Sequence, residues 1–171
     1  MATVVTQRFG TAASVTITLA SLASTSGLAS GRASTVITSS ATECVDFMVG
    51  GLVTASSQTL GSSNKQYEIW SYGTYEATGV NYTGGATGSD ADLTTVSKSN
   101  MRLLTVIPTA AVPATSSPYA FGPFSIAQAY GGALPSRWGI FVTHNSCTAI
   151  HAGVVSSYNE IRYTPVYYQS S

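Results

Sequence analysis

Apolar and polar residues alternate strictly over two short stretches of this chain. In Val15–Leu19 and in Glu160–Tyr163, every second residue is apolar, and the residues between are threonine or charged. Successive side chains of a β-strand point to opposite faces of a sheet. Both stretches are therefore predicted to be strands that turn one face to a core and the other to solvent.

Seven further stretches favour β-structure because they are rich in β-branched and aromatic residues and are bounded by turn-forming residues or prolines. They are Val4–Phe9, Ser34–Thr38, Val45–Thr54, Gln66–Tyr72, Met101–Ile107, Trp138–Thr143 and Thr164–Tyr168. Sustained helical periodicity is almost absent. The pattern predicts an all-β fold: one β-sandwich or jelly-roll domain over residues 1–171, with an extended N-terminal arm within residues 1–30 and long Pro/Gly-rich connections.

Two regions interrupt this series of strands. Five of the six prolines fall within Pro108–Pro135, and because proline lacks an N–H group, this region is predicted to connect two sheet edges and not to form a central strand. Inside it, Ser125–Tyr130 precedes a glycine pair, which predicts one or two helical turns. The glycine-rich stretch Gly73–Lys98 is predicted to be an exposed loop.

The charge content excludes several classes of function. The 171 residues carry seven Lys plus Arg and seven Asp plus Glu, so the formal net charge is zero and charged residues make up 8% of the chain. Capture of nucleic acid or anionic lipid needs a cluster of basic side chains that seven scattered cations do not form. A near-neutral surface rich in Ser and Thr favours association, so we expect a subunit of a larger assembly.

The N-terminus and the cysteines bear on the compartment. Residues 1–8 lack the basic segment and apolar run of a secretory signal, and no stretch approaches the roughly 18 apolar residues of a membrane span. We therefore expect synthesis in a cytoplasm and no membrane partner. Cys44 and Cys147 lie far apart beside strand-like residues, which favours free thiols over a disulfide framework.

One cluster of metal-ligating residue types occurs, formed by His144, Cys147 and His151. A zinc site would need a fourth ligand, for which Cys44 is available, but the usual paired cysteine spacings are absent. The alternative interpretation of this cluster is a catalytic Cys147 nucleophile with His144 or His151 as its base. Ordinary residues at a strand end remain the simpler interpretation of all three.

The carboxylate residues do not indicate a catalytic site either. Asp90 and Asp92 lie in a Gly/Ser-rich stretch without the acidic density of a calcium-binding loop, which favours a solvated turn. The sequence signatures of common hydrolases and nucleotide-binding enzymes do not occur. We therefore expect a protein that is not an enzyme, with no catalytic residue, no cofactor and no metal.

Aromatic residues are more informative, since the chain has ten tyrosines and two tryptophans. In an alternating strand, Trp70 and Tyr72 share the face opposite Tyr67 and Ile69, so both faces of this strand are bulky and both are expected to be covered. The second face fits a subunit contact or a sugar-binding platform that includes Tyr75. Packing in a core is the alternative for each side chain.

Several longer motifs resemble small virion structural proteins of tailed bacteriophages. They are Tyr119-Ala-Phe-Gly-Pro-Phe-Ser125, Gly131-Gly-Ala-Leu-Pro-Ser-Arg-Trp-Gly-Ile-Phe-Val-Thr-His-Asn145 and Ile161-Arg-Tyr-Thr-Pro-Val-Tyr167, together with Gly31-Arg-Ala-Ser-Thr35 and Val49-Gly-Gly-Leu-Val53. These motifs consist of structural residues and contain no catalytic signature. The resemblance implies kinship with that group and transfers no functional site.

What the resemblance implies is a capsid decoration, or cement, protein on the outer surface of a virion. Its partners would be the major capsid protein, other virion proteins and further copies of itself in a dimer or trimer. We expect the interface to include the arm residues Val4, Val5 and Phe9, together with the aromatic residues Trp70, Tyr72 and Tyr75. The alternatives are a tail or baseplate protein that contacts the host, and a carbohydrate-binding module that uses the same three aromatic residues.

Overall fold

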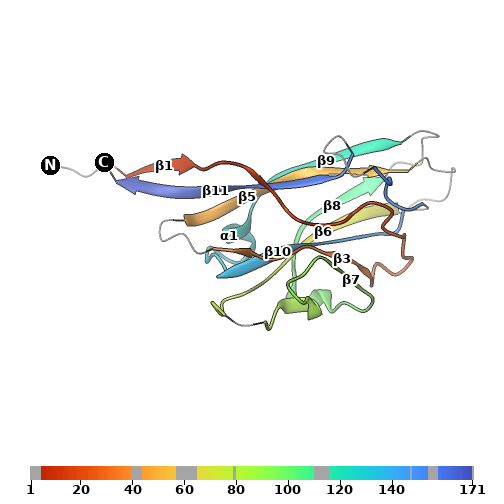
Figure 1. Ribbon diagram of the computed structural model, residues 1–171, viewed down its shortest axis with the longest axis horizontal. Coiled ribbons are helices and arrows are strands. Elements are labelled where there is room, and N and C mark those ends of the chain that lie inside the picture. Colours follow the sequence, from red (N-terminus) through yellow and green to blue (C-terminus); the bar gives the residue numbers. More distant parts are fainter. Residues whose placement is uncertain are drawn as a thin grey trace.

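The computed structural model describes residues 5–39, 44–56, 65–78, 80–109, 116–146, 148–153 and 158–170. Two antiparallel sheets pack against each other (Figure 1). The first sheet has the order β1 (Val5–Phe9), β11 (Glu160–Ser170), β5 (Cys44–Ala55), β9 (Ser117–Ser125), and β2 (Ala13–Ser14) also pairs with β11. The second has the order β7 (Ala91–Leu93), β3 (Gly31–Ala33), β10 (Arg137–His144), β6 (Lys65–Thr74), β8 (Arg102–Thr109), and β4 (Ile37–Thr38) also pairs with β10. The predicted all-β, sandwich-like class is confirmed.

The main core lies between the two sheets. Trp138 is fully buried, with its ring centre 5.2 Å from that of Phe47 and 5.8 Å from that of Tyr163. The aliphatic side chains that β5, β6, β10 and β11 contribute to this core include Val49, Val53, Ile69, Ile140, Val142 and Ile161. The period-two pattern of these strands therefore gives one continuous apolar layer between the sheets.

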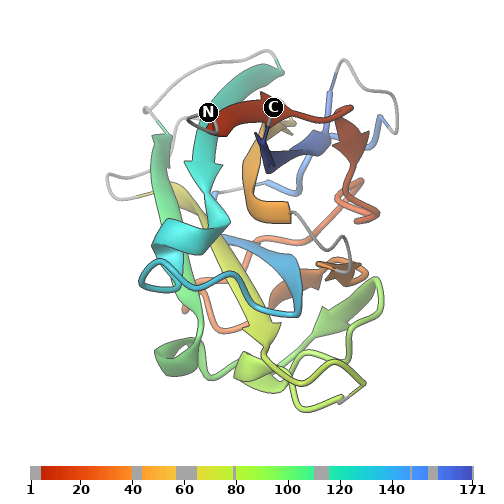
Figure 2. The same ribbon diagram turned by 90° about the vertical axis from the view of Figure 1, so that its left-hand side faces the viewer.

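A second core covers the other face of the second sheet. Tyr72 and Phe141 are fully buried there, beneath side chains from residues 80–101 such as Tyr82 and Met101. Figure 2 views the molecule from the end that lies at the left of Figure 1 and shows this segment, in green, as a third layer below the two sheets. The prediction of an exposed loop over Gly73–Lys98 is therefore right only in part: residues 75–78 and many later residues are exposed, but Tyr82, Ala86 and Leu93 are buried and cap the sheet.

Residues 15–19 do not form the predicted strand. Their side chains alternate between buried and exposed as expected, and Val15 and Leu19 belong to the main core. The main chain, however, is shared between the sheets: the N–H of Val15 donates to the carbonyl of Ile161 at 2.8 Å, and the carbonyl of Thr16 accepts from Thr35 at 2.9 Å. A segment that bridges two sheets in this way keeps the alternation without joining a ladder. The predicted arm over residues 1–30 is consequently confined, in the described part, to β1.

The remaining predicted strands correspond to β1, β4, β5, β6, β8, β10 and β11, with the two adjacent C-terminal predictions merged in β11 and Val4 outside the described residues. The proline-rich region does cross from an edge of the second sheet to an edge of the first, but it contains the unpredicted edge strand β9. Its helical turn is α1 (Ile126–Ala129), where the Ser125 hydroxyl accepts a hydrogen bond from the Gln128 N–H at 2.9 Å. Two further helical turns lie in the described part of the chain, η1 (Thr83–Gly85) and η2 (Lys98–Asn100).

Candidate functional site: the projecting arm

The arm is the two-stranded ribbon formed by β1 and the end of β11 that pairs with it. Val5 pairs with Ser170 and Phe9 pairs with Val166. The ribbon projects from one end of the body (Figure 1), and the pair Val5–Ser170 lies at its far end. All five side chains of β1 are exposed, so β1 is attached through its main chain and contributes no buried side chain to a core. Such an element has low local stability and is suited to making contacts outside its own chain.

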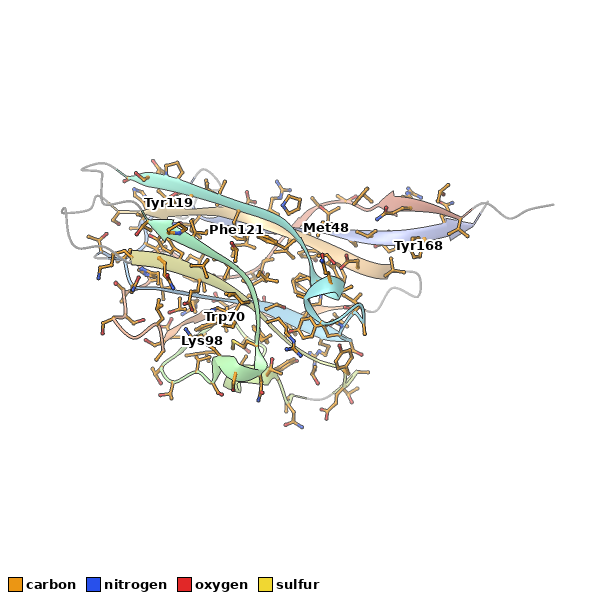
Figure 3. The ribbon with its side chains drawn as sticks, turned by 180° about the vertical axis from the view of Figure 1, so that it is seen from behind. Met48, Trp70, Lys98, Tyr119, Phe121 and Tyr168 are labelled. Atoms are coloured by element: carbon orange, nitrogen blue, oxygen red, sulfur yellow. The ribbon has the colours of Figure 1, made fainter. Side chains whose placement is uncertain are left out.

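One face of the arm carries its large exposed apolar side chains. Val5, Gln7 and Phe9 alternate onto the same face of β1, and the register places Tyr168 of β11 beside Gln7 on that face. Val5 is 62% exposed, Phe9 59% and Tyr168 55%. Figure 3 shows Tyr168 on the arm, away from Trp70 on the body. Large apolar side chains gathered on one exposed face are typical of interaction surfaces.

Tyr72 does not lie on an interface. Its ring is fully buried in the second core, and its hydroxyl donates a hydrogen bond to the carbonyl of Ser34 at 2.5 Å. Burial raises the pKa of Tyr72 to about 12. The prediction of Tyr72 as an interface residue is therefore wrong, because residues 80–101 of its own chain already cover the second face of β6. The sequence indicated that both faces would be covered but not that the chain itself supplies the cover.

Trp70 is half-buried and held by charged neighbours. Its Nε1 donates to Oε2 of Glu68 at 2.9 Å, and the Lys98 ammonium group lies 5.3 Å from the centre of its ring. Lys98 and Glu68 form an ion pair at 2.7 Å, and Figure 3 shows Trp70 and Lys98 on neighbouring segments. Burial acts to raise the pKa of Glu68, but the hydrogen bonds from Lys98 and Trp70 outweigh it and hold that pKa below its usual value.

Tyr75 is the third residue of the predicted aromatic platform. It is 58% exposed, its hydroxyl donates to the carbonyl of Ala133 at 3.1 Å, and its ring meets that of Tyr130 edge-on at 6.5 Å. With Tyr72 buried and Trp70 covered in part by Lys98, the three side chains do not form one open stacking surface. This arrangement removes the geometric basis of the sugar-platform interpretation.

His144 is a buried structural residue. Its Nε2 lies 3.0 Å from the carbonyl of Leu22, which can only accept, so Nε2 carries the proton and Nδ1 accepts from the Ser146 hydroxyl at 2.7 Å. The ring also stacks on Tyr67, with 5.1 Å between the ring centres. Burial lowers the pKa of His144 below its usual value. Both ring nitrogens are thus engaged in holding the segment around Leu22 to the end of β10.

His151, another member of the predicted ligand cluster, has partners of its own. Nδ1 of His151 accepts from the Gly153 N–H at 2.9 Å, and its ring stacks on Tyr158. Cys147 lies outside the described residues. Within the described residues no group of three His, Cys, Asp or Glu side chains is arranged to hold a metal ion. Cys44, proposed as a fourth ligand, is a free thiol whose pKa is raised by burial.

Asp90 and Asp92 both form ion pairs with Arg32. Nε of Arg32 lies 2.6 Å from Oδ1 of Asp90, and its Nη1 lies 3.0 Å from Oδ1 of Asp92. The main-chain N–H and the hydroxyl of Thr18 also donate to Asp90. Burial acts to raise the pKa of Asp90, and the hydrogen bonds from Arg32 and Thr18 lower it further than burial raises it. Asp90 therefore ties three segments together, which the prediction of a solvated turn did not anticipate.

A shallow groove on the outer face of the first sheet was not predicted. It has a volume of about 440 Å³ and opens above Gly50, between Met48, Leu52 and Pro123. A neighbouring hollow of about 310 Å³ shares Met48 and Pro123 and extends to Leu103. The glycine is the sequence signal that could have located it, because a missing side chain on an outward face of a strand leaves a depression.

No helix in the described parts of the chain is long and apolar enough to cross a membrane. Comparisons with protein family models, with curated proteins and with solved structures find no match for this chain.

Proposed function

We propose that this protein is a non-enzymatic structural subunit of a bacteriophage virion, a decoration protein that binds the outside of an assembled capsid and stabilises it. The observation that carries the proposal is the arm, a ribbon that projects from the body and exposes Val5, Phe9 and Tyr168 on one face. In a protein that acts alone, such an exposed apolar face contributes no stabilising contact. In a protein that binds an assembly, the same face is buried in the interface. The major capsid protein, other virion proteins and further copies of this chain are the proposed partners.

The buried and half-buried ionisable side chains support a structural role. Glu68 and Asp90 each accept several hydrogen bonds in ion pairs, and both ring nitrogens of His144 have partners. Each group joins segments that are distant in the sequence: Asp90 joins the segment around Thr18 to β3, and His144 joins the end of β10 to Leu22. Their positions are those of residues that stabilise a fold.

The proposed mechanism is multivalent binding. Full burial of a side chain such as Phe9 or Val5 contributes about 1.5 to 3 kcal/mol, so a single arm makes a weak contact after the cost of association is subtracted. Many copies on one shell, joined to each other, convert such contacts into firm attachment through effective concentration. Because so few residues are charged, binding should depend only weakly on salt.

Co-sedimentation with purified capsid shells of the encoding phage tests the proposal. The full-length protein should bind in hundreds of copies and raise the temperature at which the shells break, and a variant that lacks residues 1–10 should bind far less. Circular dichroism should show that the body of this variant stays folded. Normal decoration by the truncated variant would refute the role of the arm. A few copies confined to one vertex of the particle would refute decoration in favour of a tail protein.

A further inference from the structure

The sheet edges in the described structure differ in how they resist pairing with another strand. β7 has only three residues, β8 contains Pro108 and a register shift opposite β6, and β9 contains Pro118, Pro123 and a register shift opposite β5. Short edge strands, prolines and bulges are the usual devices that prevent edge-to-edge association. β2 and β4 are edge strands of two residues each, whereas β1 has five residues in unbroken register with β11 and no proline. Among these edge strands, β1 is the one that lacks all three devices.

The hydrogen-bond phase of β1 determines which main-chain groups face this open edge. The N–H of Gly10 donates to the carbonyl of Pro165 at 2.8 Å, directly after the last pair of the β1–β11 register. Bonded and non-bonded pairs alternate along an antiparallel ladder, so the even-numbered residues of β1 bond to β11. The N–H and C=O groups of Val5, Gln7 and Phe9 therefore point away from β11 toward the open edge.

We infer that β1 pairs in antiparallel fashion with β1 of a second copy of this chain, about a two-fold axis at Gln7. In this register Gln7 lies opposite the partner's Gln7, and Val5 lies opposite the partner's Phe9. All three outward-facing residues fall on hydrogen-bonded positions of the new ladder, and each pair exchanges two main-chain hydrogen bonds. The edge is therefore complementary to itself, as an isologous dimer contact requires.

The side chains fit the same register. Val5, Phe9 and Tyr168 of both copies lie on one face of the joined four-stranded ribbon, where Val5 meets the partner's Phe9. On the other face of the ribbon, Arg8 pairs with the partner's Thr6. The one charged residue of β1 therefore does not lie directly opposite the same residue of the second copy. Because the arm projects beyond the body, the two bodies lie at opposite ends of the ribbon (Figure 1). Shape, charge and hydrogen bonding thus favour a second copy over an unrelated strand.

The inference rests on the proposed function in one respect only: both assign a contact role to the arm, and the inference names a second copy of the chain as its partner. It is tested on purified full-length protein without any particle. A protein that dimerises through β1 but does not bind shells would keep this inference and refute decoration, whereas shell binding by a monomer would do the reverse.

Sedimentation velocity over a range of protein concentrations is the first test, with two substitutions at one position. Gln7→Ala keeps the outward N–H group and should dimerise like the wild type. Gln7→Pro removes that N–H group without touching a bond to β11, because proline is tolerated where a strand faces solvent. It should be monomeric at every concentration, with an unchanged circular dichroism spectrum and melting temperature. A wild type that stays monomeric up to about 1 mM, a trimer, or a dimer that Gln7→Pro leaves intact would overturn the inference.

Cysteine cross-linking tests the register and does not depend on how Gln7→Pro folds. Directly opposed residues in a hydrogen-bonded pair have Cα atoms about 5.5 Å apart, a separation that a disulfide can span. Gln7→Cys should therefore form a covalent dimer under mild oxidation. Thr6→Cys, one residue away and opposite the partner's Arg8, is the matched control and should not. Equal cross-linking of the two variants, or none in Gln7→Cys, would overturn the inference.

Discussion

The arm and strand β6 were both candidates for contact surfaces, and they differ in what covers them. β6 carries bulky side chains on both faces, and both faces are buried by the chain itself: Tyr67 lies in the main core and Tyr72 beneath residues 80–101. β1 has a modest sequence, with one aromatic residue, and nothing in the described structure covers its side chains. Aromatic density therefore marks where this protein holds itself together, whereas exposed apolar residues at a sheet edge mark where it can hold another molecule.

The largest expected effect follows from the burial of Tyr72. Tyr72→Ala should lower the free energy of unfolding by about 3 to 5 kcal/mol, because it leaves a large cavity and deprives the carbonyl of Ser34 of its hydrogen-bond donor. Urea denaturation followed by fluorescence measures this change. A loss below about 0.5 kcal/mol, as at a surface position, would mean that the third layer does not cover β6.

A smaller loss is expected where Lys98 meets Trp70 and Glu68. Lys98→Ala removes an ammonium group from a largely buried carboxylate and should lower the free energy of unfolding by about 1 to 3 kcal/mol. Lys98→Arg keeps the charge and is the matched control. Because the pKa of Glu68 is lowered by folding, its ion pair stabilises the protein above the ordinary carboxyl pKa and is lost as the pH falls through the lowered value. If the stability of Lys98→Ala equals that of Lys98→Arg at neutral pH, this ion pair does not help to hold the third layer.

His144 should make the free energy of unfolding depend on pH at higher pH values than the Glu68 ion pair does. Its pKa is lowered by folding, so the unfolded chain binds a proton first, and stability falls as the pH drops below about 6.5 toward the lowered value. The loss should be of the order of 1 kcal/mol by pH 5.5, measured by urea denaturation at both pH values. His151→Gln keeps His144 and should show the same loss. A wild-type stability that rises between pH 6.5 and 5.5 would contradict the buried, neutral His144.

The smallest expected effect on stability lies in the arm. Phe9→Ser removes a side chain that touches no core and should change the free energy of unfolding by less than about 0.5 kcal/mol. Thermal melts of both proteins at low concentration, where dimers dissociate, provide the measurement. A destabilisation comparable to that of Tyr72→Ala would show that the arm belongs to the body of the fold.

Local pattern predicted the strands well where β-branched and aromatic residues are frequent, as in β5, β10 and β11. It did worse where the partner of a segment is decided by distant residues. The alternation in residues 15–19 correctly separates buried from exposed side chains, but the main chain of this segment bonds to β11 of the first sheet and to Thr35, which connects β3 and β4 of the second. The strand β9 was missed because it contains two prolines, which an edge strand tolerates.

The site was predictable in part for the same reason. The N-terminal segment was predicted as a contact arm from its strand-like residues, and the exposure of Val5 and Phe9 is consistent with that prediction. The sequence could not reveal that β1 pairs with the C-terminal end of β11, because that pairing joins residues about 160 positions apart in the chain. Nor could glycine-rich residues 80–90 be recognised as a cover, since only Tyr82, Gly84 and Ala86 are buried there among more exposed neighbours.

The most direct test of the account compares two side chains of equal exposure in the two regions. Phe9 is 59% exposed on the arm and Tyr75 is 58% exposed at the end of β6. In a shell-binding assay, Phe9→Ser should lose most of its binding while Tyr75→Ser binds like the wild type, with both variants folded. Loss of binding in Tyr75→Ser together with normal binding of Phe9→Ser would contradict the claim that the arm makes the contact.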